Sequence, residues 1–113
     1  MVDVTMLCAR AQEVALKCAQ VQLDYSLKSL DDVSKIISDT KGLYDKMIID
    51  EPAVWNMSVL FGLYTGEVMI RNNDEYKDYK WIDNPDDIPV LATENGEINF
   101  DPITDIYKRI RNL

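Results

Sequence analysis

The segment from Pro52 to about Asn72 constrains the fold more than any other part of the sequence. Its apolar residues fall on almost every side of a helix, so a helix here has no polar face to present to water. Asp50 or Glu51 can cap its first turn, and Pro52 suits a first-turn position, where its missing N–H is no loss. We therefore predict a central helix around which the other elements pack.

Two glycines inside this helix predict a close contact. Gly62 and Gly66 lie about one turn apart on the face that also carries Ser58. Each glycine in a helix interior costs about 1 kcal/mol, which a close packing contact can offset. We expect the backbone of the first long helix to approach along this smooth groove.

The first 40 residues predict that long helix. Apolar residues recur at alternating spacings of three and four over residues 4–25, and a second set over 23–37 is displaced by about 160° around the axis. Either the helix passes between two packing partners, or it bends or breaks near Gln22. We predict one long or slightly bent helix that stops at Gly42, because residues 4–40 contain no glycine or proline.

Short segments bounded by turn residues predict an antiparallel sheet in the C-terminal part of the chain. We expect strands at 79–82, 88–93 and 97–100. Asn95-Gly96 predicts a two-residue type I′ turn between the last two strands. Asp101 and Pro102 then predict the cap and first turn of a final helix.

Together these elements predict an α+β protein. Two long N-terminal helices pack on a small three-stranded antiparallel sheet, and a short helix ends the chain. The length of 113 residues predicts a single domain, with a helical part at 1–73 and an acidic strand-and-loop part with the terminal helix at 74–113.

The net charge of −8 has a definite location in the sequence. Residues 74–105 contain ten acidic and two basic residues, whereas the rest of the chain contains ten of each. This excess argues against nucleic acid or an anionic membrane as a partner. It predicts a directional acidic surface, and the alternative is a solvated surface that keeps the protein dispersed.

Aromatic residues within the acidic region suggest anchors for a protein partner. Tyr76, Tyr79 and Trp81 alternate with charged residues, and tyrosine and tryptophan are enriched at protein interfaces. Trp81 is expected to cover the helical layer as part of the core. The predicted partner-binding residues are Tyr76, Asp78, Tyr79, Asp83, Asp86, Asp87, Glu94 and Glu97.

The sequence predicts no catalytic residue, cofactor or metal. It contains no histidine, which excludes a Ser-His-Asp or Cys-His pair and a zinc site with imidazole ligands. The acidic segment at 83–87 lacks the pattern of a calcium-binding EF-hand loop. Glu67 is a possible functional acid, because a carboxylate is costly in so apolar a helix. The structural alternative is an ion pair with Arg71, four residues further along the helix.

The cysteines and the N-terminus predict an intracellular, cytoplasmic protein. Cys8 and Cys18 are ten residues apart on one predicted helix, about 15 Å, which is too far for a disulfide. We expect both to be buried thiols. The N-terminus lacks the pattern of a signal peptide, and the most apolar stretch, 57–70, is too short to cross a bilayer.

Two motifs resemble a pattern found in small bacterial proteins of unknown function. They are LDYSLKSLDDV at 23–33 and GLYTGEV at 62–68, followed by a strand with a tryptophan and by the segment at 98–103. In size and style the chain is also similar to immunity proteins of bacterial toxin systems. The resemblance implies a bacterial cytoplasmic protein with an α+β fold, and it transfers no catalytic residue.

Three functions follow from these observations. The leading hypothesis is a non-enzymatic protein-binding module, an immunity protein whose acidic surface at 74–105 neutralises a basic, nuclease-like toxin. The second is a housekeeping interaction subunit that forms a homodimer through an exposed face of the first helix. The third is a hydrolase that uses Glu67.

Overall fold

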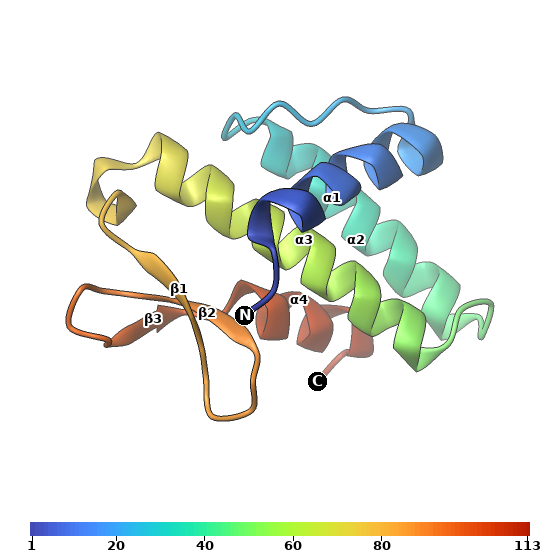
Figure 1. The fold of residues 1–113 in the computed structure, drawn as a ribbon. Helices are drawn as coiled ribbons and strands as arrows, with labels where there is room; N and C mark the ends of the chain where they lie inside the picture. The colour runs from blue at the N-terminus through green and yellow to red at the C-terminus, as the bar shows by residue number, and fades with distance from the viewer.

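The computed structural model describes residues 1–113, apart from the side chain of Asn99, and places α3 (Glu51–Asn72) at the centre of the molecule (Figure 1). The helices α1 (Val4–Ala19), α2 (Ser29–Asp45) and α4 (Pro102–Arg111) pack against it, and a small sheet lies towards one end. Asp50 caps α3 by accepting a hydrogen bond from the amide of Ala53 at 3.1 Å. The predicted central helix is confirmed, and Phe61 and Leu63 on it are completely buried.

By length and composition α3 could also cross a membrane. Its most apolar 18-residue window has a mean hydropathy of 1.2, and half of that window is buried inside the fold. The core helix of a soluble protein has the same properties, and packing against three other helices accounts for the composition of α3.

The N-terminal part of the chain forms two helices, so the predicted single helix over residues 4–40 is wrong. The first helix ends at Ala19, and Gln20 takes a left-handed conformation with φ of 57°. Residues 20–28 are irregular, and α2 begins at Ser29. The displaced apolar sets left two alternatives open, and the structure confirms the second, a break near Gln22.

Hydrogen bonds from other elements explain this break. Gln12 Nε2 donates to the carbonyl of Leu23 at 2.8 Å, and Asn72 Nδ2 donates to the carbonyl of Tyr25 at 2.7 Å. The amide of Tyr25 donates to the hydroxyl of Tyr64 at 2.8 Å. These contacts satisfy backbone groups that a continuous helix would have paired within itself, and Leu23 becomes fully buried.

Gly42 does not end a helix. It lies inside α2, which continues to Asp45, and the turn that follows closes with two backbone hydrogen bonds. The amide of Ile48 donates to the carbonyl of Leu43, and the amide of Met47 donates to the carbonyl of Tyr44, both at 2.9 Å. This is the Schellman pattern, in which glycine is the usual left-handed residue. Here Met47 takes that place with φ of 59°.

The two glycines of α3 do receive close neighbours, but the first helix is not one of them. A Cβ on Gly62 would lie 2.7 Å from the Cα of Ile103 in α4. A Cβ on Gly66 would lie 2.4 Å from the indole ring of Trp81. The smooth groove therefore accepts α4 and Trp81, and Trp81 packs against the core as expected.

The sheet is antiparallel with the order β1-β2-β3. The strands β1 (Lys80–Asp83) and β2 (Pro89–Ala92) pair regularly over their whole length. The short β3 (Ile98–Phe100) joins β2 through two residue pairs with an irregularity between them. The regular part is thus a two-stranded hairpin with a short third strand, and the α+β class is confirmed.

The Asn-Gly turn differs from the predicted two-residue type I′ turn. The amide of Gly96 donates to the carbonyl of Thr93 at 2.9 Å, and the amide of Thr93 donates to the carbonyl of Glu97 at 3.0 Å. The loop therefore has three residues, with Gly96 at φ of 80°. A type I′ turn would also need a positive φ at Asn95, which the described backbone does not have.

Candidate interaction surfaces

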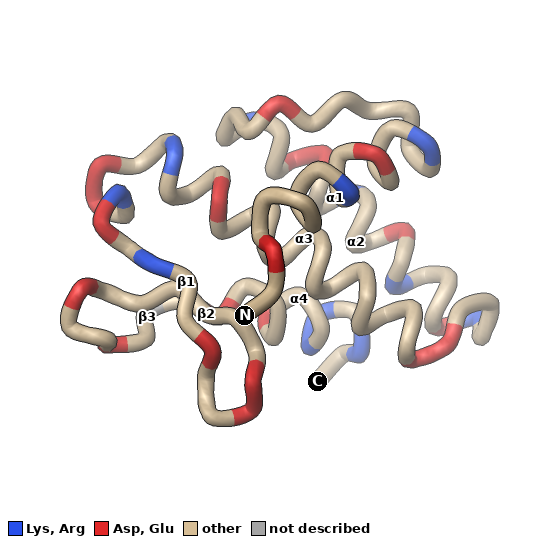
Figure 2. Tube along the Cα trace, in the orientation of Figure 1, with Lys and Arg blue, Asp and Glu red and all other residues tan. Residues whose placement is uncertain are grey.

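Most of the acidic residues in 74–105 lie towards the two opposite ends of the sheet (Figure 2), while Asp101 and Asp105 lie at the start of α4. Successive connections of an antiparallel meander lie at opposite ends, about 13 Å apart for four-residue strands. The eight predicted binding residues therefore divide into two groups. Tyr76, Asp78, Tyr79, Glu94 and Glu97 lie at or beside one end, and Asp83, Asp86 and Asp87 lie at the other.

An aromatic cluster marks the first of these ends, which we call the aromatic end. The ring of Tyr76 packs edge to face against Tyr79, with centroids 5.0 Å apart, and against Phe100 at 5.7 Å. All three rings are half-buried. Ile98, at the start of β3, is 47% exposed. Phe100 was not among the predicted binding residues, although an aromatic residue in the predicted strand at 97–100 was a usable signal.

The other end of the sheet is organised by contacts within the chain. The carboxylate of Asp83 lies 3.8 Å from the N-terminal amino group of Met1. The side-chain oxygen of Asn84 accepts hydrogen bonds from the amides of Asp86 and Ile88, at 2.8 and 3.0 Å. None of the close aromatic ring pairs among the described residues lies at this end. It offers charge without an aromatic anchor.

Glu67 has partners on both of its carboxylate oxygens. Trp81 Nε1 donates to Oε2 at 3.2 Å, and Arg71 lies 3.8 Å from Oε1, so the predicted ion pair is present. The guanidinium of Arg71 in turn lies 3.7 Å from the ring centroid of Tyr25. Glu67 lines none of the four cavities that the structure describes. Its contacts tie β1 and the 20–28 segment to α3.

The two cysteines have different surroundings, and neither forms a disulfide. Cys8 is 1% exposed, as predicted, whereas Cys18 is exposed, which corrects the prediction that both are buried. Cys18 lines an open space between α1, α2 and α3, so no neighbouring element covers its side chain. Burial, with a smaller contribution from the carboxylate of Glu67, raises the pKa of the Cys8 thiol to about 12.

We expect thiol reagents to distinguish these cysteines. The thiolate is the reactive form, and Cys8 stays protonated and covered at a pH of about 8. An aromatic disulfide reagent should therefore modify one thiol per folded chain rapidly and both in denaturant. A Cys18→Ser variant should show no fast phase. Equal fast reaction of both thiols in the folded protein would contradict the burial of Cys8.

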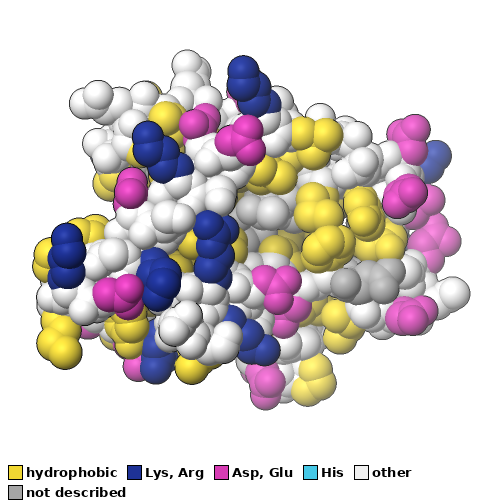
Figure 3. Space-filling model, turned by 180° about the vertical axis from the view of Figure 1, so that it is seen from behind, with side chains coloured by type: hydrophobic (Ala, Val, Ile, Leu, Met, Phe, Trp, Pro, Cys, Tyr) yellow, Lys and Arg dark blue, Asp and Glu magenta, His cyan; other side chains and the backbone are white. Residues whose placement is uncertain are grey.

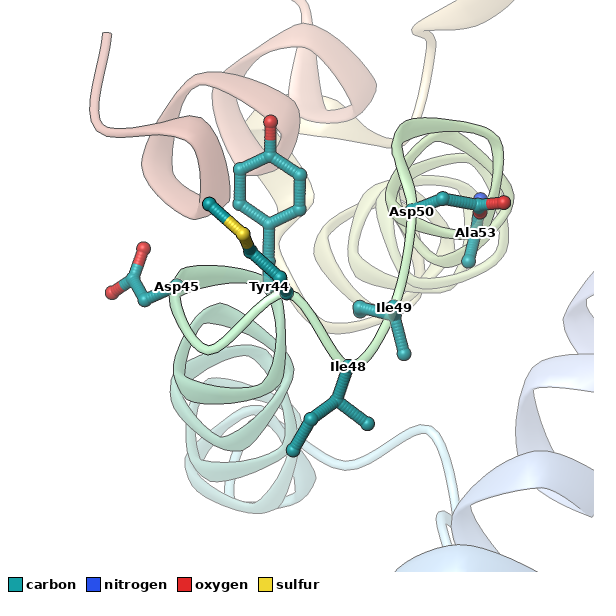
Figure 4. A pocket seen from close by; sticks show the side chains of 7 residues that line it. Tyr44, Asp45, Ile48, Ile49, Asp50 and Ala53 are labelled. Carbon is teal, nitrogen blue, oxygen red and sulfur yellow. The ribbon is translucent and has the colours of Figure 1, made fainter.

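A third candidate surface lies at the turn between α2 and α3, which we call the tip. Leu43, Met47 and Ile48 are 42%, 92% and 65% exposed there. An open hollow of about 780 Å³ lies beside it, with Tyr44 and Asp45 on one side and Asp50 and Ala53 on the other (Figure 4). Exposed apolar residues clustered in this way are typical of interaction sites.

An apolar groove of about 320 Å³ adjoins the tip. It opens between the three N-terminal helices, and it shares Ile49 and Ala53 with the hollow. The groove is lined by Cys18, Ala19, Ile36, Asp39, Thr40, Leu43, Ile49, Ala53 and Met57. Asp39 is its one charged lining residue.

Neither a metal centre nor a known relative points to a function. Among the described residues, no group of three or more cysteine or acidic side chains is placed to hold a metal ion. No known protein family matches the sequence, and no characterised protein or solved structure matches it at a significant level. The resemblance to small bacterial proteins stays a prediction, and the function has to be argued from the surfaces.

Proposed function

We propose that this chain is a non-enzymatic binding module that docks a basic protein on its aromatic end. The observation that carries the proposal is the half-buried cluster of Tyr76, Tyr79 and Phe100 beside acidic residues. Binding energy in protein interfaces concentrates in such aromatic anchors, while surrounding charges raise the association rate.

The distribution of side chains on the surface supports a basic partner. Seen from behind, hydrophobic side chains gather towards the sheet end, with acidic side chains along its outer edge and most of the basic side chains towards the opposite end (Figure 3). Such a surface attracts a positively charged protein over about 10 Å at moderate ionic strength. It then offers apolar area for close contact.

The aromatic end supports docking better than the other end of the sheet. At the other end Asp83 already pairs with the N-terminus, and Asn84 fixes the loop through hydrogen bonds inside the chain. An immunity protein that neutralises a basic, nuclease-like toxin in the bacterial cytoplasm fits this surface chemistry. The free cysteines and the similarity in size and style support that assignment.

A photocrosslinking experiment tests the proposal. A benzophenone amino acid replaces Ile98, which is 47% exposed at the aromatic end, and the chain is irradiated in its native host. The matched control places the same probe at Met6, which is 60% exposed on α1. We expect position 98, and not position 6, to capture a protein of basic pI. Failure to capture from position 98, or equal capture from both positions, would overturn the proposal.

Neutralisation of two acidic residues at each end of the sheet should have unequal effects on binding of the captured protein. Glu94→Gln with Glu97→Gln removes two charges at the aromatic end, and Asp86→Asn with Asp87→Asn removes two at the other. We expect the first pair to lower the association rate about five-fold at about 50 mM salt and the second to lower it less than about two-fold. Stopped-flow fluorescence measures both. Equal effects would contradict docking at the aromatic end.

The hydrolase hypothesis has no comparable support. Both carboxylate oxygens of Glu67 have partners within the chain, and they hold Trp81 and Arg71 in place. The homodimer hypothesis placed its contact on the first helix. The large exposed apolar residues there, Met6 and Leu16, are ten positions apart, about 15 Å, and do not form one patch. The tip is a better candidate for self-association.

A further inference from the structure

We propose that the chain forms a symmetric homodimer in which the tip of each copy enters the apolar groove of the other. Met47 and Ile48 project from the tip, and Asp39 and Leu43 are among the residues that line the groove of about 320 Å³. This surface is separate from the aromatic end and lies at the opposite end of α3 (Figure 1). The proposal therefore stands independently of the proposed function.

The first observation is that Met47 is unfavourable for the isolated chain in two ways. It is 92% exposed, although it is a large apolar side chain. It also occupies the left-handed position of a Schellman turn with φ of 59°, where a residue with a Cβ is strained and glycine is usual. The two backbone hydrogen bonds of the turn hold Met47 in this conformation, and its side chain leaves almost all its surface in water. A partner that covers Met47 would offset these costs.

The second observation is that the tip and the groove have matching positions along α2. Met47 lies four residues after Leu43, and Asp39 lies four residues before it. A two-fold axis that passes near Leu43 would pair two antiparallel copies of α2 and bring each tip to the level of the other groove. Leu43 is itself 42% exposed and would meet its own copy at the axis.

The third observation is that the charges on this surface are complementary across such an axis. The groove carries one acid, Asp39, and the tip carries Lys46 next to Met47. Both side chains are exposed, and neither has an ion-pair partner among the described residues. The two-fold arrangement places Lys46 of each copy beside Asp39 of the other. The tip, the groove and the two opposite charges lie on one surface of this chain. A second copy therefore brings the complementary group for each of them, which favours it as the occupant.

Sedimentation equilibrium of the purified chain from about 1 µM to about 300 µM, which covers dissociation constants in the micromolar range, tests the proposal. We expect a monomer–dimer equilibrium for the unmodified chain. The Met47→Gly substitution should weaken dimerisation at least about ten-fold. Because glycine suits the left-handed turn, it should also raise the melting temperature of the dilute monomer by about 2–5 °C. The control Met6→Ala, which removes an exposed methionine from α1, should dimerise as the unmodified chain does.

A charge exchange separates the proposed contact from other modes of association. Asp39→Lys and Lys46→Glu should each weaken the dimer, and the double variant should restore it, because the pair re-forms across the interface. The reaction rate of the Cys18 thiol, which lines the groove, should fall as the chain dimerises. A chain that stays monomeric at about 300 µM, or a Met47→Gly variant that dimerises normally, would overturn the proposal. So would a double variant that fails to restore association.

Discussion

The Gly62→Ala substitution is expected to lower the free energy of unfolding by about 2 kcal/mol, because the added methyl group has no space. Its Cβ would lie 2.7 Å from the Cα of Ile103 and 2.8 Å from the backbone nitrogen of the same residue. These are main-chain atoms of α4, so the whole helix would have to move. Because the clash is with main-chain atoms, the overpacking cost should lie at the upper end of its usual range, about 3 kcal/mol, and the better helix propensity of alanine returns only about 1 kcal/mol. Urea denaturation followed by circular dichroism measures the difference.

Gly42→Ala is the matched control for this prediction. Gly42 also lies inside a helix, and a Cβ there would meet nothing within 4 Å. We expect this variant to be more stable than the unmodified chain by about 0.5–1 kcal/mol, since only the propensity term remains. The same substitution should thus have opposite effects at the two positions. A Gly62→Ala protein with unchanged or increased stability would show that α4 does not approach α3 as closely as described.

The parts of the fold that the sequence predicts well are those with local signals. Asp50 and Pro52 define the start of α3, and Asp101 with Pro102 defines the start of α4. In both cases the aspartate accepts a hydrogen bond from an amide three residues further on. Caps of this kind depend on neighbouring residues alone. The all-round apolar pattern of residues 52–72 likewise predicts a buried helix without information on which elements cover it.

The break between α1 and α2 could not be predicted in the same way. No glycine or proline lies in residues 20–28, and the segment is held by side chains from distant parts of the chain. Tyr64 and Asn72, which supply two of these hydrogen bonds, are 39 and 47 residues away from Tyr25. The displaced apolar pattern indicated that the buried face changes, and only the tertiary contacts decided between a bent helix and a break.

The candidate surfaces show the same division between local and tertiary information. The sequence locates the excess of acidic residues in 74–105, because charge is a property of composition. It does not show that strand pairing separates Glu94 from Asp86, or that Tyr76 packs against Phe100. The tip was missed because Gly42 suggested an earlier helix end. The structure instead ends α2 at a turn in which Met47 occupies the usual glycine position.

The Tyr64→Phe substitution is expected to lower the free energy of unfolding by about 2–3 kcal/mol, since it removes one buried hydroxyl that joins two elements. This hydroxyl accepts a hydrogen bond from the amide of Tyr25 at 2.8 Å and lies 2.7 Å from Oγ of Ser29. The phenylalanine ring would keep the packing of a completely buried side chain. The Tyr25 amide would lose its acceptor, while Ser29 would keep its bond to the carbonyl of Ser26 at 2.6 Å. Chemical denaturation measures the loss.

Hydrogen exchange should show where this loss acts, because the Tyr64 hydroxyl contacts the 20–28 segment and the start of α2. We expect the amide of Tyr25 to exchange at least about ten-fold faster in Tyr64→Phe, while amides at the centre of α3 change only with global stability. The matched control is Tyr44→Phe, since the Tyr44 hydroxyl has no hydrogen-bond partner among the described residues and its loss should cost less than about 0.5 kcal/mol. If both variants lost equal stability, the hydroxyl of Tyr64 would not be what holds the break between α1 and α2. Faster exchange at Tyr25 alone, with the control unchanged, would identify this buried group as the contact that favours two helices over one.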